Sequence, residues 1–303
     1  MNYMIPNREP MVTVEQFLLE KGYSRHLIRQ LKQHENAILA NGHPVYTTYR
    51  LSCGETLTIT LPDSGGSERI EPVPMKLDIC YEDRDILVVN KAAGVPIHPS
   101  QGNHDNTLAN GIAWYLRQKG EACTYRVINR LDRDTTGLLI LAKHPLSACI
   151  LSDMVRNRSI SRYYTAIACG QTEEQGVIEA PIARTDDSTI ERCVDFERGE
   201  FARTHYRRLF YNPRLDLSLV ALRLETGRTH QIRVHMAHIG HPLPGDFLYH
   251  PDYRYIGRQA LHSYRLDFVH PIEKELLHFR APLPEDMQFI GVTSIEDLWD
   301  SDF

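Results

Sequence analysis

Two carboxylates stand between arginines in a short polar segment, residues 129–137, which reads N-R-L-D-R-D-T-T-G. The apolar run 136–142 that follows is typical of a buried strand. Arginines beside Asp132 and Asp134 favour the ionised carboxylate, which can act as a nucleophile or a base. Loops at the edge of a rigid strand often hold such groups. The alternative is a plain turn in which Gly137 supplies a permissive backbone.

A second segment, residues 224–245, reads LETGRTHQIRVHMAHIGHPLPG and mixes arginines with histidines. His235 and His238 would share one face of a helix over 231–238, which makes a metal site a candidate. However, no HExxH motif is present, and Arg233 would repel a cation placed among these ligands. We therefore expect no metal here, and a cleft of arginine and histidine that grips phosphate fits the charge better.

A third segment begins a predicted strand over 163–168 with a basic and two aromatic residues, Arg162, Tyr163 and Tyr164. A tyrosine can stack on a nucleic-acid base and offers a phenol for hydrogen bonding or proton transfer. The alternative is that these tyrosines only pack in the core.

The elements that must position these segments mix strands and helices without a regular βαβ rhythm. We expect strands at 85–90, 136–142, 163–168 and 217–224, and helices at 108–116, 146–155 and 231–238. This order predicts an α+β fold in which a mixed, largely antiparallel sheet is flanked by helices. We expect this sheet to carry the catalytic cleft to which the polar segments would contribute. Neither GxGxxG nor GxxxxGK[ST] occurs, so we expect no nucleotide cofactor.

The first part of the chain reads as a separate small α/β unit over 1–62. Apolar residues recur at helical spacing in 14–19 and 27–31, Asn41-Gly42 marks a hairpin turn, and 57–61 alternates like a strand. The stretch 63–74, rich in Pro, Gly and polar residues, is typical of a linker. The catalytic domain is then expected to span 75–303 and to include an acidic C-terminal tail.

The net charge of −5 hides two basic blocks. Residues 122–170 carry a net +4 and 201–265 a net +6, whereas 266–303 carry −7. We therefore expect a basic cleft open to an anionic partner, with the tail at 285–302 folded away from it. The alternative is that the basic blocks are merely solvated faces.

Composition points to a cytoplasmic protein with no membrane segment. No apolar stretch approaches the roughly 20 residues that cross a bilayer, and residues 1–10 are too polar for a signal peptide. The six cysteines form no CxxC pair, which favours reduced thiols in a cytosol.

Together the three segments resemble the RluA-type pseudouridine synthases, which isomerise uridine to pseudouridine in structured RNA. Arg130-Leu131-Asp132 with Thr136-Gly137 is similar to that family's catalytic signature, and 162–166 is similar to its K-x-Y-x-A strand, with arginine for lysine. Residues 226–246 follow its TGRxHQ[IL]RVHxxxxGHPxxGD motif. The resemblance covers roughly 80–282 and also includes Val88-Val89-Asn90-Lys91, Gly94, Pro96, Gln259-Ala260-Leu261-His262 and His270-Pro271.

The resemblance implies roles for the catalytic residues. Asp132 would be the essential carboxylate, and attack on the sugar, addition to the base and removal of a sugar proton all stay open as its step. Arg233 would pair with Asp132 and favour its ionised form. Tyr164 would pack against the target base and assist proton transfer, and Leu261 would pack in the substrate pocket. Because the isomerisation involves neither redox change nor phosphoryl transfer, no cofactor is expected.

It also implies contacts to RNA. Arg130 would fill the space left by a flipped base, and Arg228 and His230 would hold phosphate or sugar. Arg133 and Arg162 would be further RNA-binding residues. The partner would be structured RNA, ribosomal in the first place and transfer RNA as the alternative, and the protein would act as a monomer.

Two points qualify the match. The family usually has histidine where this chain has Asn129, which removes any titrating role at that position. The N-terminal unit resembles an S4-like RNA-binding domain, with Arg25, Arg29 and Lys32 as a basic stripe; a scaffold role is the alternative. Two competing functions remain: a catalytically idle RNA-binding or ribosome-assembly protein of the same fold, and a histidine-rich metal hydrolase.

Overall fold

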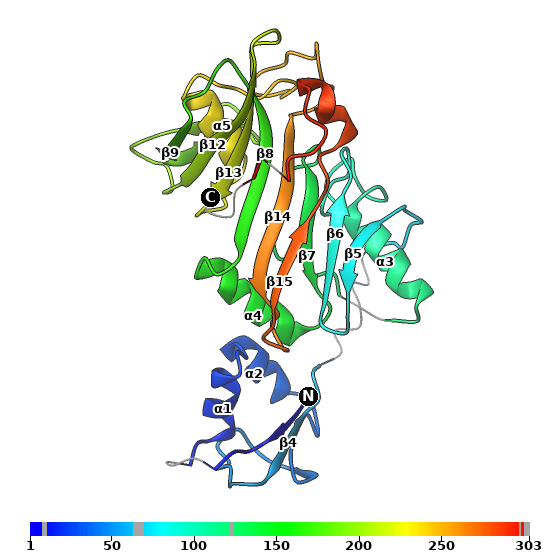
Figure 1. The fold of residues 1–303 in the computed structure, drawn as a ribbon. Coiled ribbons are helices and arrows are strands. Elements are labelled where there is room, and N and C mark those ends of the chain that lie inside the picture. Colours follow the sequence, from blue (N-terminus) through cyan, green and yellow to red (C-terminus); the bar gives the residue numbers. More distant parts are fainter. Residues whose placement is uncertain (8–10, 63–69, 122–123, 297, 300–303) are drawn as a thin grey trace.

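A computed structural model describes the chain except for residues 8–10, 63–69, 122–123, 297 and 300–303. The chain forms a small N-terminal unit and a larger domain built on one long sheet (Figure 1). Most of the predicted linker, 63–69, lies outside the described residues, as does the end of the acidic tail. No helix of the described chain is both long enough and apolar enough to cross a membrane.

The N-terminal unit packs two helices on a four-stranded sheet. Its elements are β1 (Asn2–Met4), α1 (Val14–Glu20), α2 (Arg25–Leu31), β2 (Ile38–Ala40), β3 (His43–Pro44) and β4 (Thr56–Ile59). Thr13 begins α1 with a capping box to Gln16, and Asn41 and Gly42 turn the chain with positive φ angles of 49° and 82°. Strand β1 was not predicted; it pairs antiparallel with β4.

The larger domain carries a nine-stranded sheet in the order β5-β6-β7-β14-β8-β13-β12-β9, with β15 also paired to β14. Only the short β7–β14 pairing is parallel among the described strands. The predicted α+β class with a largely antiparallel sheet is therefore confirmed. The elements are β5 (Asp78–Glu82), β6 (Ile86–Lys91), α3 (Leu108–Gln118), β7 (Thr136–Ala142), α4 (Pro145–Arg156), β8 (Ser161–Cys169), β9 (Gln175–Glu179), β10 (Ile182–Arg184), β11 (Arg192–Val194), β12 (Arg203–Asn212), β13 (Leu217–Leu224), α5 (Gln231–His238), β14 (Leu261–Val269), β15 (Leu276–Arg280) and the 3-10 helix η1 (Glu285–Ile290).

Alternating side chains let the central strands bury both faces. On β6, Leu87 and Val89 share a core with α3, whereas Ile86 and Val88 share a second core with α4. Ile232 and Met236 of α5 join the α3 core. The sheet is thus covered by helices on both faces. The two basic blocks, residues 122–170 and 201–265, meet where β7, β14 and β8 run side by side.

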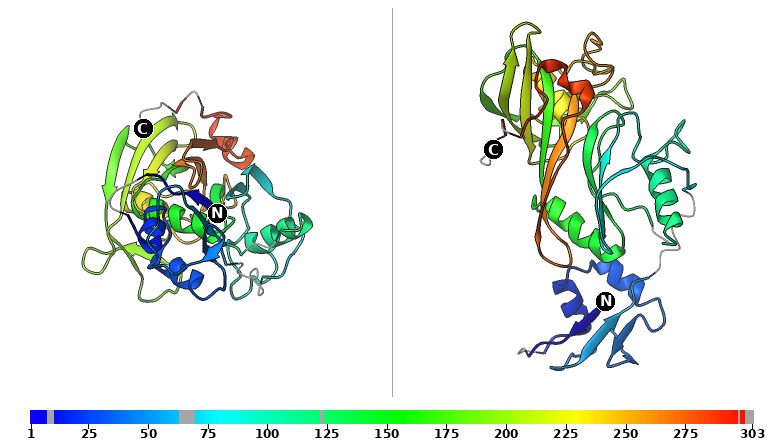
Figure 2. Two further views of the ribbon diagram at one scale, coloured as in Figure 1. Left: turned by 90° about the horizontal axis from the view of Figure 1, so that it is seen from below. Right: turned by 45° about the vertical axis from the view of Figure 1, so that its right-hand side comes forward.

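The N-terminal unit docks on helix α4, which runs across the base of the sheet (Figures 1 and 2). Leu146 of α4 belongs to the core of the N-terminal unit, and Ile150 packs against that core. The Cys149 thiol donates to Ser24 Oγ at 3.3 Å. A side chain at Gly22 would collide with Ile150, because its Cβ would lie 2.6 Å from Cγ1.

Candidate active site

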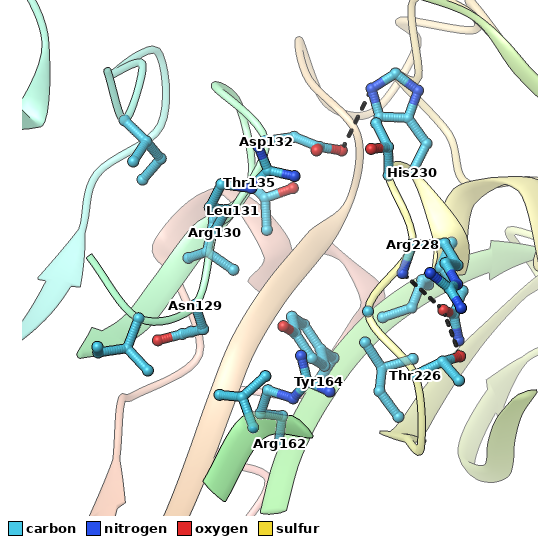
Figure 3. Close-up of a pocket in the computed structure, with 18 of the residues that line it drawn as sticks. Asn129, Arg130, Leu131, Asp132, Thr135, Arg162, Tyr164, Thr226, Arg228 and His230 are labelled. Carbon is cyan, nitrogen blue, oxygen red and sulfur yellow. Dashed lines mark hydrogen bonds and ion pairs between the residues drawn. The ribbon is translucent and has the colours of Figure 1, made fainter. Parts of the chain in front are cut away.

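One cavity of about 790 Å³ opens where β7, β8 and α5 converge (Figure 3). The loop 129–135, the face of β8 and the loop 224–230 line it. Eight of the nine site residues predicted from sequence border this cavity: Arg130, Asp132, Arg162, Tyr164, Arg228, His230, Arg233 and Leu261. The ninth, Arg133, does not; it pairs with Asp134 at 3.0 Å and is exposed outside the cavity.

Backbone contacts from distant segments hold the loop that carries Asp132. The buried Lys91 donates from Nζ to the carbonyl oxygens of Ala92, Val95 and Arg133 at 2.7, 3.0 and 2.7 Å. Arg258 donates to the Asp134 carbonyl at 3.2 Å. The segment that carries Asp132 is therefore a turn whose geometry is fixed by contacts from several other segments.

Asn129 fastens the start of this loop to strand β7. Its Oδ1 accepts the Ile140 N–H at 2.8 Å, and its Nδ2 donates to the Leu138 carbonyl at 3.3 Å. The amide thus supplies one acceptor and one donor to the backbone of β7, where the Leu138 carbonyl also accepts from Ser263 Oγ at 3.0 Å. At this position the side chain has a structural role that needs no titrating group.

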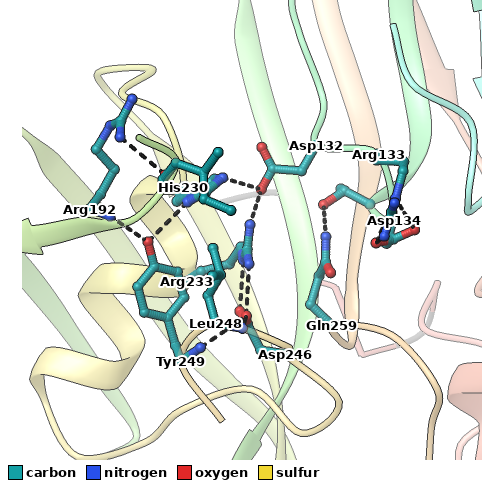
Figure 4. Close-up of polar contacts among 12 residues, drawn as sticks. Asp132, Arg133, Asp134, Arg192, His230, Arg233, Asp246, Leu248, Tyr249 and Gln259 are labelled. Atoms are coloured by element: carbon teal, nitrogen blue, oxygen red, sulfur yellow. Dashed lines mark hydrogen bonds and ion pairs between the residues drawn. The ribbon is translucent and has the colours of Figure 1, made fainter. Parts of the chain in front are cut away.

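Asp132 faces Arg233, which is itself held by a second carboxylate (Figure 4). Arg233 Nη1 donates to Asp132 Oδ2 at 2.8 Å, while Nε and Nη2 donate to the two oxygens of Asp246 at 2.7 Å each. The Arg233 and Asp246 side chains are 1% and 0% exposed, whereas Asp132 is 27% exposed. Burial lowers the pKa of Arg233, but the hydrogen bond to Asp246 and the charges of both carboxylates outweigh it and raise this pKa overall. The guanidinium is therefore a permanent cation that orients Asp132.

His230 approaches the same carboxylate from the other side. Its Nε2 lies 4.0 Å from Asp132 Oδ2, and its Nδ1 is 2.9 Å from the hydroxyl of Tyr249. That hydroxyl also accepts the N–H of Arg192 at 3.0 Å. Burial lowers the pKa of His230, so the ring is neutral near pH 7. With the Arg192 N–H already accepted, the phenol hydrogen is directed to Nδ1, which leaves the ring proton on Nε2, toward Asp132.

Tyr164 forms the floor of the cavity below Asp132. It lies on the buried face of β8, in the same apolar core as Leu261. Burial raises the pKa of Tyr164, so the phenol keeps its proton at neutral pH. A flat, apolar floor with one hydroxyl suits a planar heterocycle.

The arginines predicted to contact RNA differ in whether a carboxylate of the protein pairs with them. Arg228 donates from Nε to the Phe201 carbonyl at 3.0 Å and forms an ion pair with Glu200. Arg130 is exposed at the cavity rim. Six arginines and only two carboxylate residues line the cavity, so it is basic although the protein as a whole is acidic. In the described chain, no residue after Leu261 lines the cavity. Asp286 of the acidic tail instead pairs with Arg258 at 2.7 Å.

The histidines of the second segment point to separate partners. His235 lies 2.9 Å from both Thr204 Oγ1 and the Ala180 carbonyl, and His241 Nδ1 lies 2.8 Å from the Cys169 carbonyl. In the part of the chain that the structure describes, the ligand cluster that could hold a metal is Asp83, Asp85 and His270, none of them from this segment. The geometry of these histidines therefore favours structural roles.

Sequence reasoning missed three residues that build the site. Asp246 was seen only as the end of a motif, yet it orients Arg233. Lys91 contacts the Asp132 loop from 42 positions away, and Tyr249 contacts His230 from 19 positions further along the chain. Only the motif resemblance around Lys91 and Asp246 could have signalled a role, and Tyr249 carried no signal.

Comparisons with known proteins identify the family of the chain. Residues 85–238 match the family model described as RNA pseudouridylate synthase. The chain is 42% identical over 277 residues to the uncharacterized RNA pseudouridine synthase YjbO of Bacillus subtilis, covering 91% of this chain and 97% of that protein. It is 39% identical to the ribosomal large subunit pseudouridine synthase D of Zymomonas mobilis, covering 82% and 80% of the two chains. The structure of human RNA pseudouridylate synthase domain containing 1 matches with a TM-score of 0.57 and 28% identity, covering 68% of this chain and 83% of that one.

Proposed function

Because the chain belongs to the RNA pseudouridylate synthase family and is an RNA pseudouridine synthase, we propose that it modifies ribosomal RNA of the large subunit, with Asp132 as the essential carboxylate. The choice of RNA is supported by relatives named ribosomal large subunit pseudouridine synthase D in several bacteria. The observation that carries the catalytic assignment is the ion pair of Asp132 with the buried Arg233, above Tyr164, inside an arginine-lined cavity.

The reaction breaks the bond between N1 and C1′ of uridine and forms a bond between C5 and C1′. N1 gains a proton and C5 loses one, so no electron acceptor is needed and we propose that the enzyme uses no cofactor. Arg233 occupies Oδ2 of Asp132, and Figure 4 shows the second oxygen directed away from this pair. That free oxygen is the one available for attack on the sugar, addition to the base or removal of a sugar proton.

The remaining residues bind and hold the nucleotide. The target uridine leaves its stack at a cost on the order of a few kcal/mol, and Arg130 at the rim takes the vacated place. Tyr164 packs against the freed base, Leu261 shapes the pocket, and the Tyr164 phenol supports proton transfer at C5. His230 and Arg228 contact sugar and phosphate, Arg162 is a further RNA-binding residue of the cavity, and the exposed Arg133 contacts RNA outside the cavity.

We assign the N-terminal unit, residues 1–62, an S4-like RNA-binding role. Arg25, Arg29 and Lys32 are exposed along α2, which is the stripe expected from sequence. The unit is docked on α4, whose last residues, Val155 and Arg156, border the cavity. RNA bound along α2 would therefore continue toward the active site. We further propose that the protein acts as a monomer in the cytoplasm, where ribosomal RNA is made in bacteria.

The experiment that tests this function uses large-subunit ribosomal RNA from a strain that lacks the gene. Purified wild-type protein should restore pseudouridine at defined positions, as mapped by carbodiimide modification, and Asp132→Asn and Asp132→Ala should restore none while still binding RNA. Asp134→Asn is the matched control, because Asp134 lies in the same loop but outside the cavity. Full activity of either Asp132 variant would overturn the assignment. A deletion strain with unchanged pseudouridine sites would instead support the idle RNA-binding protein.

A further inference from the structure

Arg162 is a buried guanidinium without a counterion in the wall of the catalytic cavity. The residue is 8% exposed, and its Nε has no hydrogen-bond partner among the described residues. Throughout the ranges that the structure describes, no carboxylate forms an ion pair with it. Buried charges in proteins are normally paired, because an unpaired charge loses its hydration without compensation.

The other arginines of the cavity are satisfied or hydrated. Arg156 pairs with Asp153 at 2.6 Å and Arg158 with Glu225 at 3.0 Å. Arg228 pairs with Glu200, and Arg233 with two aspartates. Arg130 is exposed to water at the rim. Among the lining arginines, Arg162 thus combines burial with the lack of a partner.

A glycine leaves the space in which this guanidinium lies. A Cβ at Gly227 would stand 2.7 Å from Arg162 Nη1, so any side chain there would displace the guanidinium. Gly227 belongs to the loop that also carries Arg228 and His230. The guanidinium is therefore packed against a backbone wall of the cavity instead of extending into solvent.

Its place fits a phosphate that flanks the reacting nucleotide. Arg162 and Tyr164 are two residues apart on β8, so they lie on the same face at a spacing of about 6–7 Å. Figure 3 shows Tyr164 between Asp132 and Arg162. A base on Tyr164 with its sugar toward Asp132 would place a neighbouring backbone phosphate within reach of Arg162. A guanidinium binds phosphate through two parallel hydrogen bonds.

We propose that Arg162 and the Gly227 wall form an anion site that binds an RNA backbone phosphate beside the target uridine. The missing counterion of the free protein is then supplied by the substrate. This inference rests on the proposed function and adds to it the chemistry of one substrate contact.

The test compares Arg162→Met, Arg162→Lys and Arg254→Met with wild type. Methionine keeps an apolar stem without charge, and lysine keeps the charge. Arg254→Met is the matched control, because Arg254 is exposed, lies outside the cavity and pairs with Asp252. The first measurement is RNA affinity against salt concentration, with large-subunit ribosomal RNA as the probe. Removing one phosphate contact should lower the slope of log K against log salt by about 0.7–0.9 in Arg162→Met only.

The second measurement is the unfolding midpoint with inorganic phosphate replacing chloride at constant ionic strength. Phosphate should raise the midpoint of wild type, Arg162→Lys and Arg254→Met, but not that of Arg162→Met. In chloride, Arg162→Met should unfold no earlier than wild type, because it no longer buries an unpaired charge. An earlier midpoint in chloride, an unchanged salt slope, or an equal phosphate effect on wild type and Arg162→Met would overturn the proposal. If wild type modifies no ribosomal RNA, the proposed function fails, and the phosphate measurement still decides this site.

Discussion

Arg233 holds Asp246 through two parallel hydrogen bonds of 2.7 Å, from Nε to Oδ2 and from Nη2 to Oδ1, and both side chains are sealed from solvent. This pairing leaves one guanidinium nitrogen, Nη1, for Asp132. Asp246 therefore fixes the position of the Arg233 guanidinium, and the guanidinium in turn orients the Asp132 carboxylate.

Asp246→Asn should destabilise the protein strongly and remove most activity. The change leaves a buried guanidinium with one carboxylate instead of two, and breaking a buried pair typically costs about 3–5 kcal/mol. Urea unfolding measures the loss. Asp132→Asn is the comparison, because Asp132 is partly exposed and its removal leaves the Arg233–Asp246 pair intact. Equal free energies of unfolding of the two variants would contradict a larger structural role for Asp246 than for Asp132.

Tyr249→Phe should lower the turnover rate about tenfold while leaving RNA affinity close to wild type. The phenol bridges the Arg192 N–H and His230 Nδ1, and without it the ring proton is no longer held on Nε2. Nitrogen-15 spectra of histidine-labelled protein report this tautomer, and the His230 signals are assigned from a His230→Gln sample. Tyr253→Phe, a change at an exposed phenol, is the control. An unaltered His230 spectrum in Tyr249→Phe would refute the bridging role.

Lys91→Met should loosen the loop that carries Asp132 and remove a pH-dependent part of the free energy of unfolding. Burial lowers the pKa of Lys91 to about 7, whereas a lysine in an unfolded chain keeps its proton to about 10.4. Between these values the unfolded chain binds more protons, so the contribution of Lys91 to the free energy of unfolding rises as pH increases from 7 to 10. Urea unfolding at pH 7 and pH 9 should show this increase in wild type and in Lys76→Met, an exposed control, but a smaller one in Lys91→Met. The same increase in all three proteins would argue against a lowered pKa.

Gly137→Ala should destabilise the junction of β7 and β14 by more than backbone strain alone. Gly137 has a φ of 108°, and a Cβ there would lie 2.2 Å from the Ser263 carbonyl oxygen. Gly102 has a φ of 80° but open space around its Cβ, so Gly102→Ala isolates the strain, about 1 kcal/mol. We expect thermal unfolding of Gly137→Ala at a clearly lower midpoint than Gly102→Ala. Similar midpoints would contradict a steric clash between a Cβ at position 137 on β7 and Ser263 on β14.

Much of the local structure could be read from residue patterns. Strands 136–142 and 217–224 and the helix 231–238 lie at the predicted bounds, because their burial follows from apolar runs and helical spacing. The three-residue strand β1 could not be predicted, since its stability comes from pairing with β4 more than 50 residues away. The order of strands in the sheet is likewise a property of long-range pairing.

The sequence by itself determined the family, the fold class and eight of the residues that line the cavity, because those motifs are short and each lies within one loop, strand or helix. Only the tertiary structure decided which of these charged residues form ion pairs with one another. Asp132 and Arg233 are 101 positions apart, and Arg233 is held a second time by Asp246, 13 positions further along the chain. Tertiary packing also sets Arg133 outside the cavity and leaves Arg162 buried without a counterion. An ion pair depends on a few ångströms of separation and on exclusion of water, and neither is encoded in a residue's neighbours along the chain.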